Sequence, residues 1–178
     1  MLERAAELAL LTSAAERLWQ GEGGVAIVAG EAGIGKSTLL DSFLSALPDG
    51  SRVLRGWCDN LVAAHPLGPI REAVRGRPGS LSAGAGLDAA LAGGDVPGVL
   101  AGLSESLAHG RPAVLVIEDL HWADDATLDV LAYLCRRRDR LRTLLVCSLR
   151  PEDSSSSALR RFLGGLPTRT PCGSTWRR

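Results

Sequence analysis

Residues 30–38 read Gly30-Glu31-Ala32-Gly33-Ile34-Gly35-Lys36-Ser37-Thr38. This stretch fits the pattern G-x-x-x-x-G-K-[ST], which is typical of a P-loop that binds nucleotide phosphates. The apolar run before it, residues 25–29, is short enough for a buried strand, and residues 39–47 after it have apolar side chains at helical spacing. The sequence therefore predicts a phosphate-binding loop between a strand and a helix.

The residue types of this loop suit a triphosphate. Its three glycines can adopt backbone angles closed to other residues, so several N–H groups can point at one anion. The following helix adds its positive N-terminal end. We expect all nine residues, 30–38, to bind ATP, with Lys36 reaching the β- and γ-phosphates and the Ser37 hydroxyl holding Mg²⁺.

Lys36 is the only lysine among the twenty basic residues of the chain; the other nineteen are arginines. A compact ammonium on a thin stem stands at the one position where a phosphate ligand needs it. The alternative, a glycine-rich turn with a stray lysine, is weakened by the flanking strand and helix patterns.

The composition limits the class of protein. A length of 178 residues allows one domain with a real core, and twenty acidic residues balance the twenty basic ones. No apolar run approaches the roughly 20 residues of a membrane span, and the first residues lack the layout of a signal peptide. The four cysteines are scattered without a C-x-x-C pair. These observations favour a cytoplasmic protein with reduced, buried cysteines and no membrane partner.

Further elements follow a strand–helix alternation. We expect an amphipathic helix over residues 2–19, a strand over 52–58, and short helices at 70–75, 87–92 and 96–108. Residues 76–86, rich in Gly, Ser and Pro, are expected to form a mobile loop. Strand, helix and strand at this spacing predict a parallel sheet.

A second motif lies at residues 112–119, where an aliphatic run ends in Glu118 and Asp119. Parallel strands deliver their carboxyl ends to one sheet edge, the edge at which the P-loop also lies. One acid can orient Mg²⁺ through water, and the next can polarise an attacking water. The alternative is a strand that ends in solvated acids. It is less favoured because the nucleotide phosphates alone would leave Mg²⁺ with too few ligands.

The C-terminal part continues the alternation. We expect a helix over 125–138 capped by Asp124 or Asp125, a strand over 144–151, and a helix over 158–163. Arg150 ends the last strand at the same sheet edge. It is a candidate contact to the γ-phosphate, and a plain surface arginine is the alternative.

Two stretches carry a family resemblance: GEAGIGKSTLL at residues 30–40 and VLVIEDLHWAD at residues 114–124. They resemble the ATPase domain of STAND-type NTPases in the AAA-like superfamily, as found in large bacterial LuxR-type transcriptional regulators and related signalling proteins. The spacing of residues 52–58 and 144–153 is similar too. The resemblance covers about residues 2–166. We expect residues 1–166 to form the ATPase domain, with a disordered tail at 167–178.

The resemblance implies a role for each matching residue. Lys36, Asp119 and Arg150 would serve hydrolysis, and Asp119 would activate water. Ser37 and Glu118 would hold Mg²⁺, although the family more often has Asp at the position of Glu118. Arg4 resembles an arginine that borders the adenine, but Glu3 replaces the glycine of that motif.

The implied fold is α/β: a P-loop NTPase three-layer sandwich, mostly parallel, with helices on both faces. Proteins of this family are usually far longer and add further domains, often including one that binds DNA. This chain ends before a fifth core strand is recognisable. We therefore expect a sheet that is incomplete at the C-terminus, in a shortened copy of such a protein.

The sequence is compatible with three functions. The first is a regulatory module that binds Mg-ATP, hydrolyses it slowly if at all, and partners other domains or further copies of itself. The second is a free-standing kinase for a small molecule, and the third is a remnant with weak nucleotide binding. DNA binding by this chain alone is not expected, because the chain is neutral and shows no helix-turn-helix pattern.

Overall fold

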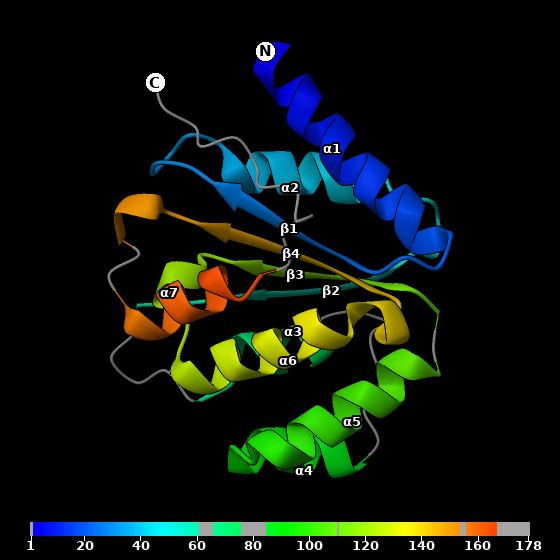
Figure 1. The fold of residues 1–178 in the computed structure, drawn as a ribbon, viewed down its shortest axis with the longest axis vertical. Coiled ribbons are helices and arrows are strands. Elements are labelled where there is room, and N and C mark those ends of the chain that lie inside the picture. The colour runs from blue at the N-terminus through cyan, green and yellow to red at the C-terminus, as the bar shows by residue number, and fades with distance from the viewer. Residues whose placement is uncertain (1, 61–65, 76–84, 110, 154–155, 167–178) are drawn as a thin grey trace.

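The computed structural model of the chain describes residues 2–60, 66–75, 85–109, 111–153 and 156–166. Within them, a parallel sheet lies between layers of helices (Figure 1). The predicted tail, Cys172 and most of the predicted loop at 76–86 lie outside these ranges, as does the side chain of Arg4.

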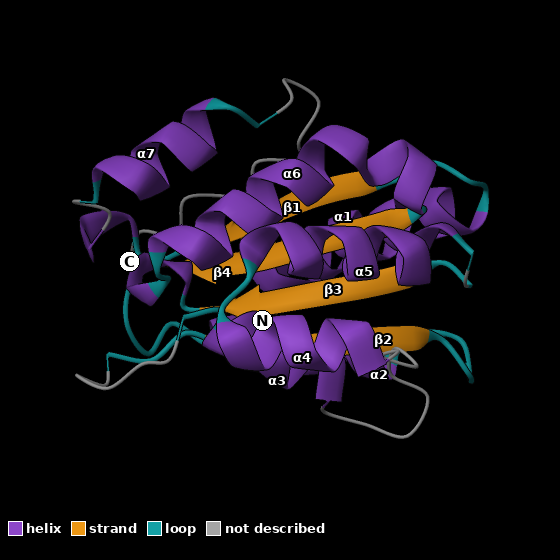
Figure 2. Cartoon of the chain, turned by 90° about the horizontal axis from the view of Figure 1, so that it is seen from below, coloured by secondary structure: helices purple, strands orange, loops and turns teal. Residues whose placement is uncertain are grey.

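The sheet has four parallel strands in the spatial order β1-β4-β3-β2, which Figure 2 shows edge to edge. The order along the chain is β1 (Gly24–Ala29), β2 (Arg52–Trp57), β3 (Ala113–Glu118) and β4 (Thr143–Leu149). Every residue of β3 and β4 is buried, as expected for central strands covered on both faces. This burial explains why their sequences read as continuous apolar runs.

Helices cover both faces of the sheet (Figure 1). One face carries α1 (Leu2–Trp19) and α2 (Lys36–Ser45); the other carries α3 (Gly68–Arg75), α6 (Asp125–Leu141) and α7 (Ser157–Gly164), with α4 (Ala85–Gly93) and α5 (Val96–Ala108) further out. Two short 3₁₀ turns, η1 (Leu120–Trp122) and η2 (Pro151–Asp153), follow the central strands. The predicted α/β class, with a parallel sheet between helices, is confirmed. None of the described helices has the length and hydropathy of a membrane span.

The bounds of several helices differ from the sequence prediction, most informatively those of α4 and α6. α4 begins at Ala85, so residues 85 and 86 are helical rather than part of a loop. α6 continues to Leu141 instead of ending near residue 138, and it stops where Arg142 adopts a left-handed backbone with φ 47°. The N–H of Arg142 then bonds the carbonyls of Arg138 and Asp139, which closes the helix with a local cap that apolar periodicity does not reveal.

Alternation along β3 decides which face receives the acidic end of the strand. Val114 and Val116 pack in the apolar cluster formed with α1 and α2, whereas Leu115 and Ile117 belong to the cluster beneath α3 and α6. Side chains two residues apart share a face, so Glu118 continues the series of Val114 and Val116. Glu118 therefore lies on the α2 side, at the edge where the P-loop leaves β1.

Candidate nucleotide site

The P-loop adopts the backbone that its glycines predict. Gly33 and Gly35 have φ values of 72° and 94°, in the left-handed region that favours glycine. Gly35 is the N-cap of α2 and offers no side chain to the first turn, so the helix start is left without a side-chain cap. The N–H of Gly30 donates to the carbonyl of Leu149 at 3.2 Å, which ties the loop to the end of β4. A helix start of this kind suits an anion.

Lys36 lies folded over its own loop. Its ammonium donates to the carbonyl oxygens of Gly30 at 2.8 Å and Glu31 at 2.9 Å, and the residue is only 9% exposed. Burial lowers the pKa of Lys36, and the charge of Asp119 opposes this shift while that of Arg150 adds to it. The single lysine therefore sits within electrostatic range of two other predicted site residues.

Ser37 and Glu118 meet across the fold. The hydroxyl of Ser37 donates to Oε2 of Glu118 at 2.7 Å, although the two residues are 81 positions apart. The carboxylate is buried, with Glu118 only 1% exposed. This contact joins the first turn of α2 to the end of β3, so the two predicted metal ligands are neighbours.

The donor set of this pair fits Mg²⁺. A hydroxyl and a carboxylate are hard oxygen ligands, and protein-bound Mg²⁺ usually takes one or two such groups together with substrate phosphates and water. In the part of the chain that the structure describes, no group of three or more His, Cys, Asp or Glu residues could hold a metal by itself. Ser37 and Glu118 could supply the protein's share of a Mg²⁺ ligand set, with phosphates and water supplying the rest.

Arg55 is a site residue that the sequence analysis did not single out. Its Nε donates to Oε1 of Glu118 at 2.7 Å, its Nη2 donates to the same oxygen, and its Nη1 donates to Oδ1 of Asp41 at 2.6 Å. Burial lowers the pKa of Arg55, but the hydrogen bonds to Asp41 and Glu118 outweigh it and raise the pKa overall. No motif marks Arg55 in the sequence. The register of β2 and β3 reveals it, because Trp57, two residues later, pairs with Glu118.

Asp119 has an unusual backbone. Its φ of 53° and ψ of 46° lie in the left-handed region, which few residues other than glycine, Asn and Asp adopt readily. Its N–H donates to Oγ of Ser148 at 3.0 Å, at the end of β4. The backbone therefore leaves the extended conformation of β3 immediately after Glu118, and Asp119 does not continue the strand.

A cluster of ionisable side chains, formed by His121, Arg150 and Asp153, follows the ends of β3 and β4. Nη1 of Arg150 is 3.7 Å from Oδ2 of Asp153, and Nε2 of His121 is 3.8 Å from the same oxygen. The ring of His121 is buried. Burial lowers the pKa of His121, with Asp119 opposing the shift and Arg150 adding to it. The sequence gives His121 no role, although the residue lies within the stretch 114–124 that carries the family resemblance.

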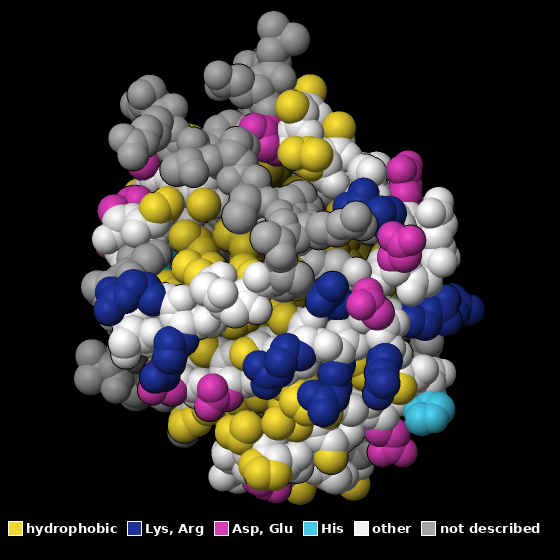
Figure 3. Space-filling view, viewed as in Figure 1, with side chains coloured by type: hydrophobic (Ala, Val, Ile, Leu, Met, Phe, Trp, Pro, Cys, Tyr) yellow, Lys and Arg dark blue, Asp and Glu magenta, His cyan; other side chains and the backbone are white. Residues whose placement is uncertain are grey.

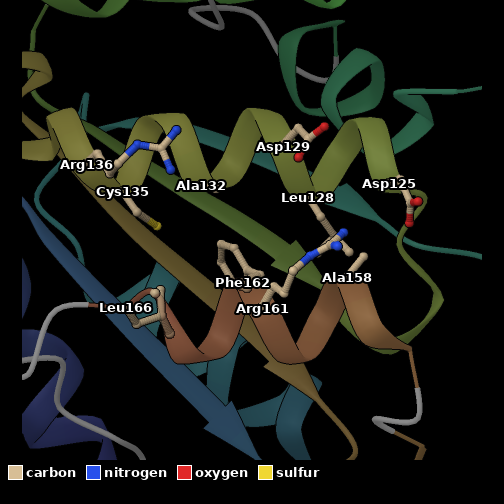
Figure 4. A pocket seen from close by; sticks show the side chains of 11 residues that line it. Asp125, Leu128, Asp129, Ala132, Cys135, Arg136, Ala158, Arg161, Phe162 and Leu166 are labelled. Atoms are coloured by element: carbon tan, nitrogen blue, oxygen red, sulfur yellow. The ribbon is translucent and has the colours of Figure 1, made fainter.

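Taken together, the predicted site residues gather at one edge of the sheet. The loop, Lys36 and Ser37 follow β1, the two acids follow β3, and Arg150 follows β4. Outside this edge, α6 and α7 border a cavity of about 230 Å³ whose lining combines apolar side chains and Cys135 with the charged side chains of Asp125, Asp129, Arg136 and Arg161 (Figure 4). Burial raises the pKa of Cys135 to about 12, so its thiol is not a ready nucleophile.

Comparisons with known proteins agree with this architecture. No curated protein is similar enough in sequence to serve as a relative. The Drosophila ORC structure bound to DNA has 15% identity and a TM-score of 0.55, over 90% of this chain and 87% of that chain. The Aeropyrum pernix ORC2 protein, solved as ADPNP-ADP complexes, has 16% identity and a TM-score of 0.52, over 92% of this chain and 46% of that chain. At such identities the likeness concerns the fold alone.

A match to a protein-family model identifies the family. The matching model describes the AAA ATPase domain and covers residues 1–147, more than three quarters of the chain. Together with the four-stranded parallel sheet and the P-loop between β1 and α2, this match shows that the chain belongs to the AAA ATPase domain family.

Proposed function

We propose that this chain binds ATP with Mg²⁺ and acts as a switch-type regulatory ATPase module. The observation that carries the proposal is the contact between Ser37 and Glu118, because it brings a hydroxyl and a carboxylate together beside an anion-binding helix start. A nucleotide phosphate there would meet the loop amides and the Lys36 ammonium. The metal would then be shared between the phosphates and this oxygen pair.

The contacts of Lys36 support such a role. The carbonyls of Gly30 and Glu31 hold its ammonium over the loop, and a bound phosphate would offer a stronger, charged acceptor to the same group. Burial lowers the pKa of Lys36, and an anionic ligand would oppose that shift because it stabilises the ammonium.

Hydrolysis, where it occurs, would depend on Asp119 and Arg150. Asp119 is the candidate to polarise a water molecule, and Arg150 is the candidate to contact the γ-phosphate. Both lie within electrostatic range of Lys36. We expect slow ATP hydrolysis that switches the module between states. Transfer of the γ-phosphate to a small molecule instead of to water would make the chain a kinase.

We further propose that the module has a regulatory role. It is supported by the similarity of residues 30–40 and 114–124 to the ATPase domains of LuxR-type and other STAND regulators. We infer a cytoplasmic module that works with further domains or with copies of itself. On the face of Figure 3 several basic side chains lie in a row, with acidic side chains nearby. The chain as a whole has no excess of basic residues, which does not favour DNA binding by this chain alone.

Calorimetric titration of the full chain with ATP tests the proposal. We expect binding that strengthens when Mg²⁺ is added and that is lost in Lys36→Ala, while the surface variant Arg136→Ala binds like the wild type. Equal affinity in wild type and Lys36→Ala would refute the loop assignment. Absence of ATP binding in the wild type would favour the alternative that the chain is a remnant with weak nucleotide binding.

A second measurement separates an ATPase from a kinase. We expect inorganic phosphate as the product, released at the same rate with and without candidate small-molecule acceptors. Transfer of labelled phosphate to an acceptor would overturn the ATPase assignment.

A further inference from the structure

Glu118 carries a buried carboxylate whose two oxygens face different partners. Oε2 accepts from the Ser37 hydroxyl, and Oε1 accepts from Nε and Nη2 of Arg55. A buried charge is costly unless it is paired and hydrogen-bonded. Arg55 supplies the paired charge, and it leaves Oε2 turned toward the loop.

We propose that Arg55 is a positioning residue that fixes the carboxylate of Glu118 in the orientation required to hold Mg²⁺ beside Ser37. The inference rests on the proposed Mg-ATP function and adds a residue outside both sequence motifs. The observation behind this inference is that the two oxygens of Glu118 have different partners. Arg55 binds Oε1, and Ser37 binds Oε2.

The chemistry of the acid explains why such a residue is needed. Glu has one more rotatable bond than Asp, so its carboxylate has more orientations to lose when it is held in place. A guanidinium is planar and donates two N–H groups in fixed directions, so it constrains a carboxylate more tightly than a single point charge would. Arg55 therefore compensates for the longer arm of Glu118.

Arg55 is itself held from two sides. Its Nη1 donates to Asp41 on α2, and its guanidinium lies 4.8 Å from the centroid of the Trp57 ring. Its side chain is 21% exposed, whereas the side chain of Asp41 is 59% exposed. The contacts run from the solvent-exposed side of α2 to the buried acid, so Arg55 is oriented before any ligand arrives.

The Mg²⁺ dependence of ATP binding distinguishes positioning from a purely structural ion pair. In Arg55→Ala we expect the Mg²⁺ concentration for half-maximal strengthening of ATP binding to rise about 10- to 100-fold, as for other residues that orient metal ligands. ATP binding in EDTA should change less than about twofold, because the loop amides and Lys36 are untouched. Arg55→Lys should show a smaller rise than Arg55→Ala.

Arg52→Ala is the matched control. Arg52 lies on the same strand and donates to the carbonyl of Ser106, away from Glu118. Its loss should leave the Mg²⁺ requirement at the wild-type value. Should Arg55→Ala fail to fold, Arg55→Lys still carries the test, since it keeps the charge and loses the planar fork.

Chemical rescue adds a sharper criterion. Arg55 lines an open cavity of about 450 Å³ together with Asp41, Val53, Trp57 and Glu72, so a small cation can reach the vacated position. Guanidinium ions at millimolar concentration should lower the Mg²⁺ requirement of Arg55→Ala and leave that of Arg52→Ala unchanged.

Each remaining outcome bears on one proposal only. An unchanged or lowered Mg²⁺ requirement in folded Arg55→Ala or Arg55→Lys overturns the inference, as does a shift that guanidinium does not reverse. A wild-type chain that binds ATP with no response to Mg²⁺ removes the proposed function instead.

Discussion

The backbone N–H of Asp119 donates a hydrogen bond to the hydroxyl oxygen of Ser148 at a distance of 3.0 Å. The bond joins the carboxyl ends of β3 and β4, and it holds Asp119 in a left-handed conformation that most side chains avoid. The backbone position of Asp119, from which its side chain projects, is therefore set by two strands.

Asp119→Asn is predicted to separate binding from turnover. Asn tolerates the left-handed backbone as Asp does, so the fold should be retained. An amide is a poor proton acceptor, so we expect phosphate release to slow by about 100-fold or more while ATP affinity changes little. Steady-state release assays and calorimetry on the same preparation measure the two effects. Asp125→Asn is the control, and parallel loss of binding and turnover would assign Asp119 to metal holding.

Gly56→Ala is predicted to destabilise the fold. A Cβ at this position would lie 2.0 Å from the carbonyl oxygen of Pro69, which is backbone and cannot turn away. We expect a loss of about 1–3 kcal/mol in the free energy of unfolding, because α3 must move off β2. Gly86→Ala, where a Cβ meets nothing within 4 Å, should stay within about 0.5 kcal/mol of wild type in the same urea titrations. Equal stability of the two variants would contradict the close packing.

The pH dependence of stability should report on His121. Burial lowers its folded-state pKa, with Asp119 and Asp153 opposing and Arg150 and Lys36 adding to the shift. The unfolded chain takes up a proton near the ordinary value of about 6.5. The stability contributed by neutral His121 is thus complete above about pH 6.5 and is lost as the pH falls through the lower folded-state pKa.

Replacing His121 by Gln removes this titration. We expect the difference in unfolding free energy between pH 7.5 and pH 5.5 to be smaller in His121→Gln than in the wild type, as measured by urea titration at both pH values. A pH profile that is the same in both proteins would show that His121 does not contribute.

Asp124 should stabilise the start of α6. Its carboxylate accepts from the N–H of Thr127 at 2.9 Å and from the Thr127 hydroxyl at 2.6 Å. Loss of such a cap costs about 0.5–2 kcal/mol, and Asp124→Ala should fall in this range in thermal or urea unfolding. Asp125→Ala, which removes a neighbouring charge but no cap, is the comparison, and an equal or larger effect there would contradict the assignment.

Local patterns carried most of the fold prediction. The four strands, the helices over residues 2–19 and 96–108, and the loop at 30–38 follow from apolar periodicity and from a motif whose residues are adjacent in sequence. Apolar periodicity depends on one element and its neighbours, so it is legible without knowledge of the rest of the chain. It fails at local caps, as at Arg142, where backbone geometry ends the helix.

The sequence by itself determined the P-loop, the strand that delivers Glu118 and Asp119, and the α/β class. Only the tertiary structure decided that Arg55 pairs with Glu118 across 63 positions and that Ser37 meets the same carboxylate across 81. The reason is physical: strand order and register bring these side chains together, and both arise from the packing of distant segments. No run of residues near Arg55 distinguishes it from the other arginines until β2 is placed beside β3.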